Sequence, residues 1–139
     1  EVIANHLIPR AHGRWLFIWN DDAIIRTDGW DHALANIEDD VVLRPETSHP
    51  SPIKGLNTFP IVPKKWIDLV GWSRDGANDT WFQEVGRMLG RQNDVPILIN
   101  HTPSDSAKQG YDSSAFFSMR TYYQMGVHAG RIHQKFYAQ

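Results

Sequence analysis

The apolar run at residues 15–19 (Trp-Leu-Phe-Ile-Trp) stops abruptly at the polar triplet Asn20, Asp21 and Asp22. A run without polar alternation is typical of a strand buried on both faces, so we predict such a strand over residues 14–19. Adjacent carboxylates repel each other unless a cation, a hydrogen-bond donor or water relieves the repulsion. Because open α/β sheets hold ligands at the carboxyl ends of strands, the triplet is a candidate ligand site; a polar loop after the strand is the plainer alternative.

Strand and helix patterns alternate along the rest of the chain. Apolar spacing predicts helices over residues 30–37, 63–70, 80–90 and from 114 onward. Further strands are predicted at 41–43, at 59–62 as an edge strand that tolerates proline, and at 95–99 as a buried strand. Long polar loops are predicted at 45–58 and 102–113. The pattern indicates an α/β fold with a mostly parallel or mixed sheet.

Two details of these helices follow from the same patterns. We expect Thr27 or Asp28 to cap the helix at 30–37. The last helix is predicted from apolar residues that recur at helical spacing, namely Phe116, Met119, Tyr123 and Val127.

Composition limits the classes of protein. The 139 residues, 41% of them hydrophobic, suit a single domain over 1–139 with a substantial core. The formal net charge of −2 argues against a nucleic acid partner, and the absence of cysteine excludes disulfides and thiolate metal sites. No apolar run approaches the length of a membrane span, so we expect no transmembrane segment. The sequence therefore predicts a cytoplasmic protein, with peripheral attachment to a membrane left open.

Three ionisable residues follow an apolar element or open a helix: Asp22, His101 and Asp79. If the strands at 14–19 and 95–99 share a sheet and run parallel, Asp22 and His101 emerge at the same edge. A carboxylate and an imidazole are a reasonable partial shell for Mn²⁺ or Mg²⁺, completed by phosphate oxygens and water. Taken singly, His101 also fits a hydrogen-bonded loop histidine. Asp79 fits either a general base or a carboxylate stabilised by a helix N-terminus.

Trp72 differs from the tryptophans on apolar helix faces because it sits in a polar turn before Asp79. An aromatic ring there would suit stacking on a sugar, and it would equally suit anchoring of the turn.

In their order and spacing, these segments resemble the second half of a GT-A glycosyltransferase, most closely the family 2 type. Residues 11–22 are similar to its A-x-G-x-(apolar strand)-D-x-D segment, and residues 28–31 to the start of the following helix. Residues 59–66 resemble its acceptor-side segment, and residues 78–82 its E-D motif. His101 stands where a histidine that contacts metal or diphosphate is often found. The resemblance covers about residues 1–105.

The resemblance implies a three-layer GT-A fold and an inverting, metal-dependent transfer of a sugar from a nucleotide-diphosphate donor to an acceptor hydroxyl of a glycan or other molecule. It implies that Asp22 and His101 hold the divalent cation (Mn²⁺ or Mg²⁺), that Asn20 and Asp21 contact the donor, and that Asp79 is the catalytic base. Trp72 would contact the acceptor.

The chain departs from the family pattern in three ways. Asn20 replaces the first acid of D-x-D, and Asn78 replaces the acid before the base. The family's N-terminal βαβ half, which holds the nucleotide base and ribose, would precede Glu1. We therefore expect a partial catalytic domain, or one that depends on a partner chain, and a homo-oligomer is one arrangement that would provide it.

Two other functions fit the same residues. One is a non-catalytic module of glycosyltransferase type that binds a nucleotide-sugar, glycan or protein. The other is a metal-dependent phosphohydrolase or nuclease that uses Asp21, Asp22 and His101, for which the absence of a basic surface argues against a nucleic acid substrate.

Overall fold

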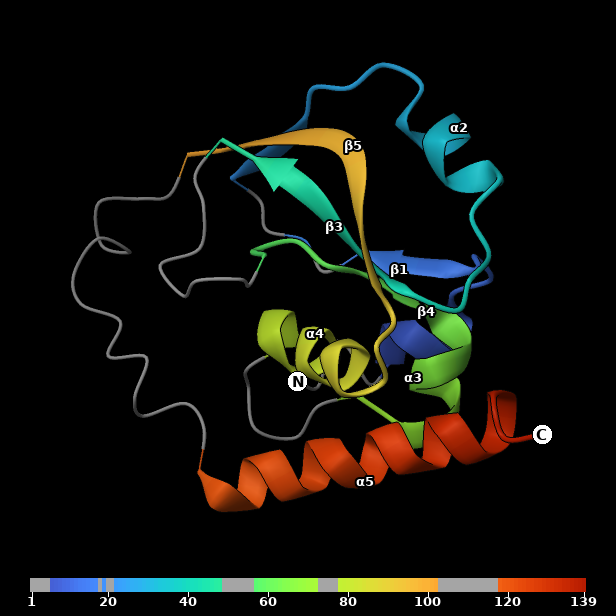
Figure 1. Ribbon diagram of the computed structural model, residues 1–139. Helices are drawn as coiled ribbons and strands as arrows, with labels where there is room; N and C mark the ends of the chain where they lie inside the picture. The colour runs from blue at the N-terminus through green and yellow to red at the C-terminus, as the bar shows by residue number, and fades with distance from the viewer. Residues whose placement is uncertain (1–5, 18, 20–21, 49–56, 73–77, 103–117) are drawn as a thin grey trace.

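The computed structural model describes residues 6–17, 19, 22–48, 57–72, 78–102 and 118–139. In this part of the chain, helices cover both faces of one five-stranded mixed sheet (Figure 1). The elements in chain order are η1 (Ile8–Arg10), β1 (Trp15–Phe17), β2 (Ala23–Ile25), α2 (Trp30–Ala35), β3 (Val42–Thr47), β4 (Ile61–Pro63), α3 (Lys64–Val70), α4 (Asn78–Met88), β5 (Gln92–His101) and α5 (Met119–Phe136). The predicted α/β class is confirmed.

The strands lie in the order β1-β4-β3-β5-β2. β4 is antiparallel to β1 and β3, β3 is parallel to β5, and β2 is antiparallel to β5. β1, β3 and β5 therefore point the same way, and we call the end at which they finish the carboxyl end of the sheet. Since β1 and β2 are the two outermost strands, the chain passes from one side of the sheet to the other between Phe17 and Ala23.

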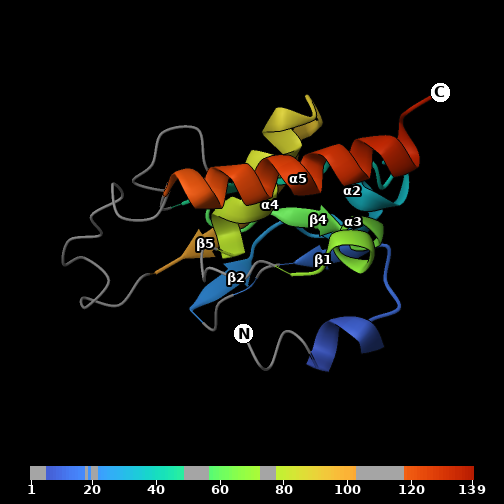
Figure 2. The same cartoon turned by 90° about the horizontal axis from the view of Figure 1, so that it is seen from below.

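Helices α3, α4 and α5 cover one face of the sheet, with α5 lying along α3 and α4 as the outer layer (Figure 2). The buried cluster on this face consists of Val42, Val62, Trp66, Ile67, Trp81, Phe82, Val85, Met125, Ala129 and Ile132. Two tryptophan side chains, one on α3 and one on α4, also form hydrogen bonds with residues in or directly after α5. Trp66 Nε1 donates to Tyr137 Oη at 3.1 Å, and Trp81 Nε1 donates to His128 Nδ1 at 3.2 Å.

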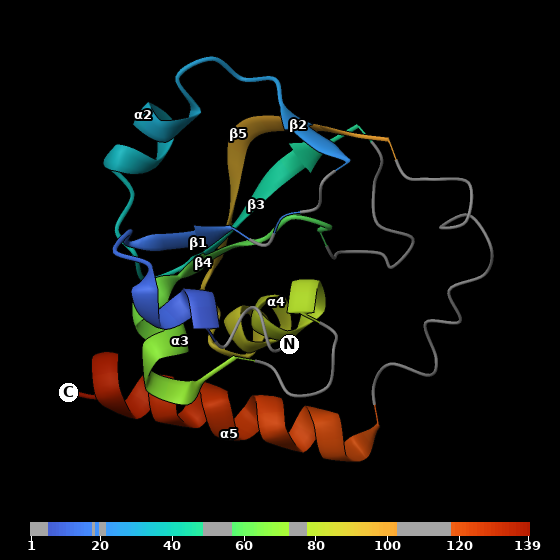
Figure 3. The same cartoon turned by 180° about the vertical axis from the view of Figure 1, so that it is seen from behind.

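The opposite face packs under α2. Its buried cluster consists of Ala23, Leu34, Leu43, Phe59, Ile61, Val95, Ile97 and Ile99. Alternation along the strands divides the two clusters, because Val42 and Leu43 are consecutive and point to opposite faces. Figure 3 shows β2 beside β5 at the far side of the sheet from β1.

The strands differ from the prediction in position. β1 was expected to be buried on both faces, but it is an edge strand and its three residues are half-buried. The segment at 59–62 was expected at an edge, yet β4 lies between β1 and β3. An inner strand accommodates Pro63 because this residue ends the strand, and the next ladder position is filled by Lys64, whose N–H donates to Arg14 O at 2.8 Å.

Two strands are also longer than predicted. β3 continues to Thr47, so residues 45–47 belong to the sheet and not to the predicted loop; residues 49–56 of that loop lie outside the described part of the chain. β5 runs over ten residues and buries Val95, Ile97 and Ile99, while Leu98 between them is 40% exposed. It is therefore buried on one face, and not on both as predicted.

Helices α3 and α4 end within two residues of the predicted boundaries, and each is followed by a glycine with positive φ, Gly71 at 82° and Gly90 at 65°. The predicted cap of α2 is wrong. Its N-cap is Gly29, with φ of 64°, and Thr27 Oγ1 instead accepts the Leu98 N–H at 2.7 Å.

The predicted last helix is present as α5, but the apolar residues that indicated it do not form its buried face. Met119, Tyr123 and Val127 are 89%, 74% and 42% exposed, and Phe116 lies outside the described residues. The buried residues are Thr121, Met125, Ala129 and Ile132. The exposed set and the buried set each form a stripe of residues at helical spacing in the first part of α5. Only the second continues with an apolar side chain, Ile132, whereas the first continues with Gly130 and Gln134. The second stripe therefore buries apolar surface over the whole helix.

Candidate functional site

Asp22 and His101 lie in contact at the carboxyl end of the sheet. Asp22 directly precedes β2, and His101 is the last residue of β5. β2 pairs with β5 so that Ala23 faces His101, which makes Asp22 and His101 neighbours. Asp22 Oδ2 is 3.3 Å from His101 Nε2. The predicted proximity is therefore present, although Asp22 reaches His101 by opening the neighbouring strand β2.

The pair is partly shielded from solvent. The His101 side chain is 10% exposed and that of Asp22 is 35% exposed. Asp22 Oδ1 is buried and accepts no hydrogen bond from any residue in the described part of the chain. A buried carboxylate oxygen without a donor is costly, and a bound cation or ligand donor would satisfy it.

Ser48 and Phe59 hold His101 in place. Ser48 follows β3 and accepts the His101 N–H at 3.0 Å through Oγ, and the same hydroxyl donates to Asn100 Oδ1 at 2.8 Å. The Phe59 ring meets the His101 ring edge-on, with centroids 5.0 Å apart. These contacts fix both the backbone and the ring of His101.

A scan against protein-family models, a search of curated proteins and a search of solved structures found no match for this chain. The glycosyltransferase resemblance therefore stays a prediction. None of the helices described is long and apolar enough to cross a membrane.

The other predicted site residues are placed only in part. Asn20 and Asp21 lie outside the described residues. Asp79 is the second residue of α4, and its side chain is likewise outside the description. The half-buried Trp72 ring packs at 5.8 Å from the Phe82 ring, in the cluster under α3, α4 and α5. Phe59, which contacts His101, belongs to the cluster on the opposite face of the sheet, so Trp72 and the Asp22–His101 pair are associated with different clusters.

The spacing of the pair lies within ion-pair distance, and it is also compatible with two ligands of a divalent cation. Mg²⁺ holds its ligands at about 2.1 Å in an octahedral arrangement, so adjacent ligand atoms are about 3 Å apart. The 3.3 Å between Asp22 Oδ2 and His101 Nε2 is close to this spacing. Among the described residues, no group of three or more His, Cys, Asp or Glu could hold a metal ion. The described residues thus offer two ligands, and phosphate oxygens and water would supply the others.

Sequence reasoning missed Ser48 and Phe59. Ser48 falls in the segment predicted to be a loop, and Phe59 was assigned to a strand. The polar residues that follow or end β3 and β5 could have indicated Ser48, because these strands are adjacent and parallel and finish at the same end of the sheet. That signal becomes readable only when the pairing of β3 with β5 is known.

Proposed function

We propose that this chain is part of a GT-A-type glycosyltransferase that transfers a sugar from a nucleotide-diphosphate donor to an acceptor hydroxyl. The observation that carries the proposal is the Asp22–His101 pair, with its 3.3 Å separation and a buried Asp22 oxygen that accepts no hydrogen bond from the described residues. A carboxylate and an imidazole of this kind suit a cation bound to a diphosphate.

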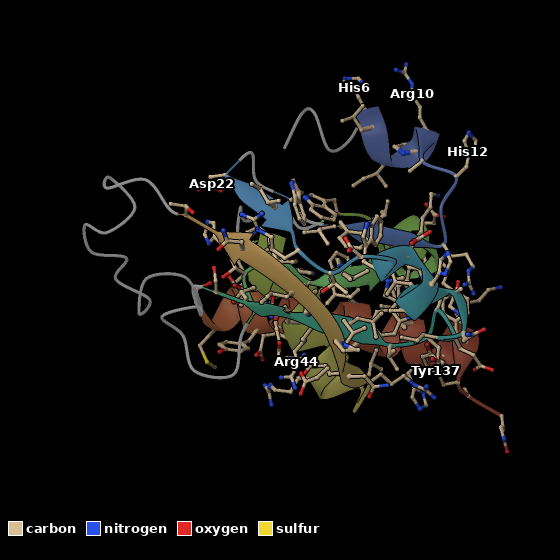
Figure 4. The ribbon with its side chains drawn as sticks, turned by 90° about the horizontal axis from the view of Figure 1, so that it is seen from above. His6, Arg10, His12, Asp22, Arg44 and Tyr137 are labelled. Atoms are coloured by element: carbon tan, nitrogen blue, oxygen red, sulfur yellow. The ribbon has the colours of Figure 1, made fainter. Side chains whose placement is uncertain are left out.

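The sheet supports this proposal through the position of the pair. β1, β3 and β5 finish at the carboxyl end of the sheet. There Ser48 directly follows β3, and His101 is the last residue of β5. Ligands of open α/β sheets bind outside this end. In Figure 4, Asp22 lies at one end of the molecule and Tyr137, which follows α5, lies at the other. The mixed sheet with helices on both faces belongs to the α/β class, to which the GT-A fold also belongs.

In this mechanism Asp22 and His101 would hold a divalent cation at the site of the donor diphosphate. The cation, when bound, offsets the negative charge that grows on the leaving diphosphate. Asp79, which lies in the first turn of α4, accepts the proton of the acceptor hydroxyl. The hydroxyl oxygen forms a bond to the anomeric carbon from the side opposite to the diphosphate. The bond from that carbon to the diphosphate oxygen breaks, its electron pair leaves with the diphosphate, and the configuration inverts.

The test of the site is nucleoside diphosphate binding by the full chain. We expect UDP or GDP to bind in the presence of Mn²⁺, and we expect Asp22→Asn to weaken that binding at least tenfold in calorimetric titrations. Asp31→Asn is the matched control, because Asp31 is a 64% exposed carboxylate on α2. Equal affinity of the Asp22→Asn variant and the wild type would refute the assignment of the site.

The test of the reaction is sugar transfer to hydroxyl acceptors. We expect Asp79→Asn to abolish transfer while leaving donor affinity within about twofold, since a general base contributes to the chemical step. Unaltered turnover in this variant would exclude Asp79 as the base. Nucleotide binding by the wild type without transfer to any acceptor would instead favour the non-catalytic binding module.

A further inference from the structure

A row of aromatic rings leads from α2 to the Asp22–His101 pair. The Trp30 ring is 5.2 Å from that of Phe17, Phe17 is 6.3 Å from Trp19, and Trp19 is 5.5 Å from Phe59. Phe59 then meets His101 at 5.0 Å. The Trp19 indole is therefore within two ring spacings of the imidazole.

Trp19 is the most exposed tryptophan of the chain. Its exposure is 39%, whereas Trp66 and Trp81 are buried and Trp15, Trp30 and Trp72 are intermediate. Phe59, on which Trp19 rests, is only 1% exposed. The Trp19 indole is supported by the buried Phe59 ring and the half-buried Phe17 ring, and its exposed part presents apolar area beside the polar pair.

Resting on the proposed function, we propose that Trp19 is the platform on which a pyranose ring of the substrate packs. The C–H face of a sugar ring is apolar and slightly positive, and it suits the negative face of an indole. The donor sugar is bonded directly to the diphosphate, so a diphosphate held at Asp22 and His101 brings that sugar within reach of a ring two spacings away. Phe17 and Phe59 already restrain the indole, so less conformational entropy is lost when a ligand packs on it.

The structural alternative is that Trp19 only shields Phe59. Two variants separate these roles. Trp19→Leu keeps an apolar cover over Phe59 and removes the aromatic face, and Trp19→Phe keeps an aromatic face. Trp30→Leu is the matched control, because Trp30 belongs to the same row at the end far from His101.

The experiment is calorimetric titration of the 139-residue chain with UDP-glucose, UDP and glucose in the presence of Mn²⁺, and with GDP-mannose, GDP and mannose as a second set. We expect Trp19→Leu to weaken nucleotide-sugar binding by about tenfold while UDP or GDP affinity stays within about twofold. Trp19→Phe should recover most of the loss, and Trp30→Leu should match the wild type. If an acceptor sugar packs on Trp19 instead of the donor sugar, Trp19→Leu should weaken the binding of the free sugar and leave the affinity for the nucleotide-sugar unchanged.

Failure of this proposal is distinguishable from failure of the proposed function. Nucleotide binding that depends on Asp22, together with unchanged affinity of a folded Trp19→Leu variant for every sugar probe, would overturn only the platform. Absence of nucleotide binding by the wild type would overturn both. Thermal unfolding of each variant shows whether a lost affinity reflects a lost fold.

Discussion

Gln83 connects helix α4 to the segment that carries Phe59. Its side chain is fully buried. Gln83 Nε2 donates to the carbonyl oxygen of Asn57 at 2.6 Å, and Gln83 Oε1 accepts the Asn57 N–H at 2.7 Å. Asn57 Oδ1 then accepts the Phe59 N–H at 2.8 Å. The amide of Gln83 thus fixes the backbone that places Phe59 against His101.

Gln83→Met keeps the length of the side chain and removes both hydrogen bonds. The N–H and C=O of Asn57 would then lose their partners in a half-buried position. Because each of these two groups costs about 1–3 kcal/mol, we expect the free energy of unfolding to fall by about 2–6 kcal/mol. For a domain of this size, that loss lowers the Tm by roughly 7–20 °C.

The assay is urea unfolding followed by circular dichroism and tryptophan fluorescence, with Gln134→Met as the control. Gln134 lies on the exposed face of α5, so its replacement should change the free energy of unfolding by less than about 0.5 kcal/mol. In the Gln83→Met variant, the NMR signals of the His101 ring should also shift, because Phe59 loses its anchor. A Gln83→Met protein as stable as the control would refute the inference that these two hydrogen bonds hold the segment.

Two glycines and one tyrosine give further tests. A Cβ at Gly86 would lie 2.9 Å from Val42 Cγ2 and 3.0 Å from Arg91 O, so Gly86→Ala should destabilise the fold by about 1–3 kcal/mol in urea unfolding. Gly126→Ala, on the open face of α5 where a Cβ meets nothing within 4 Å, should stabilise it by about 0.5–1 kcal/mol; the reverse order would contradict the packing. Burial raises the pKa of the Tyr137 hydroxyl. The stability that the protonated Tyr137 contributes is therefore fully present below about pH 10, and it is lost as the pH rises through the raised pKa. Stability measured between pH 9 and 12 should therefore decline less in Tyr137→Phe, and equal declines would exclude this cause.

The helices α3 and α4 could be predicted because their signals are local. Apolar residues recur at helical spacing, and Gly71 and Gly90 stand where each helix ends. The inner face of α5 could not be read in the same way. Met125 and Tyr123 belong to competing stripes, and only the surfaces of α3 and α4 decide which stripe is buried.

The proximity of Asp22 and His101 was predicted from the direction of the strands that precede them. Strand β2, whose pairing with β5 brings them together, was not predicted. β2 has three residues, Ala23–Ile25, too few for a periodic pattern. The short β2 nevertheless decides the geometry, because its pairing with β5 sets Ala23 opposite His101. The sequence therefore indicated which residues meet, while the register that joins them depends on pairing between distant segments.

Trp19 shows why the end of an apolar run is difficult to interpret from sequence. The run predicted a buried strand through Trp19, but β1 ends at Phe17 and is the outermost strand of the sheet. By Ala23 the chain has reached the opposite side, with Trp19 against Phe59 and Asp22 against His101. The apolar Trp19 therefore does not belong to a buried strand. The chain gives an indole and a carboxylate, three residues apart, to the same end of the sheet, which is the arrangement that a ligand with one apolar ring and one charged group requires.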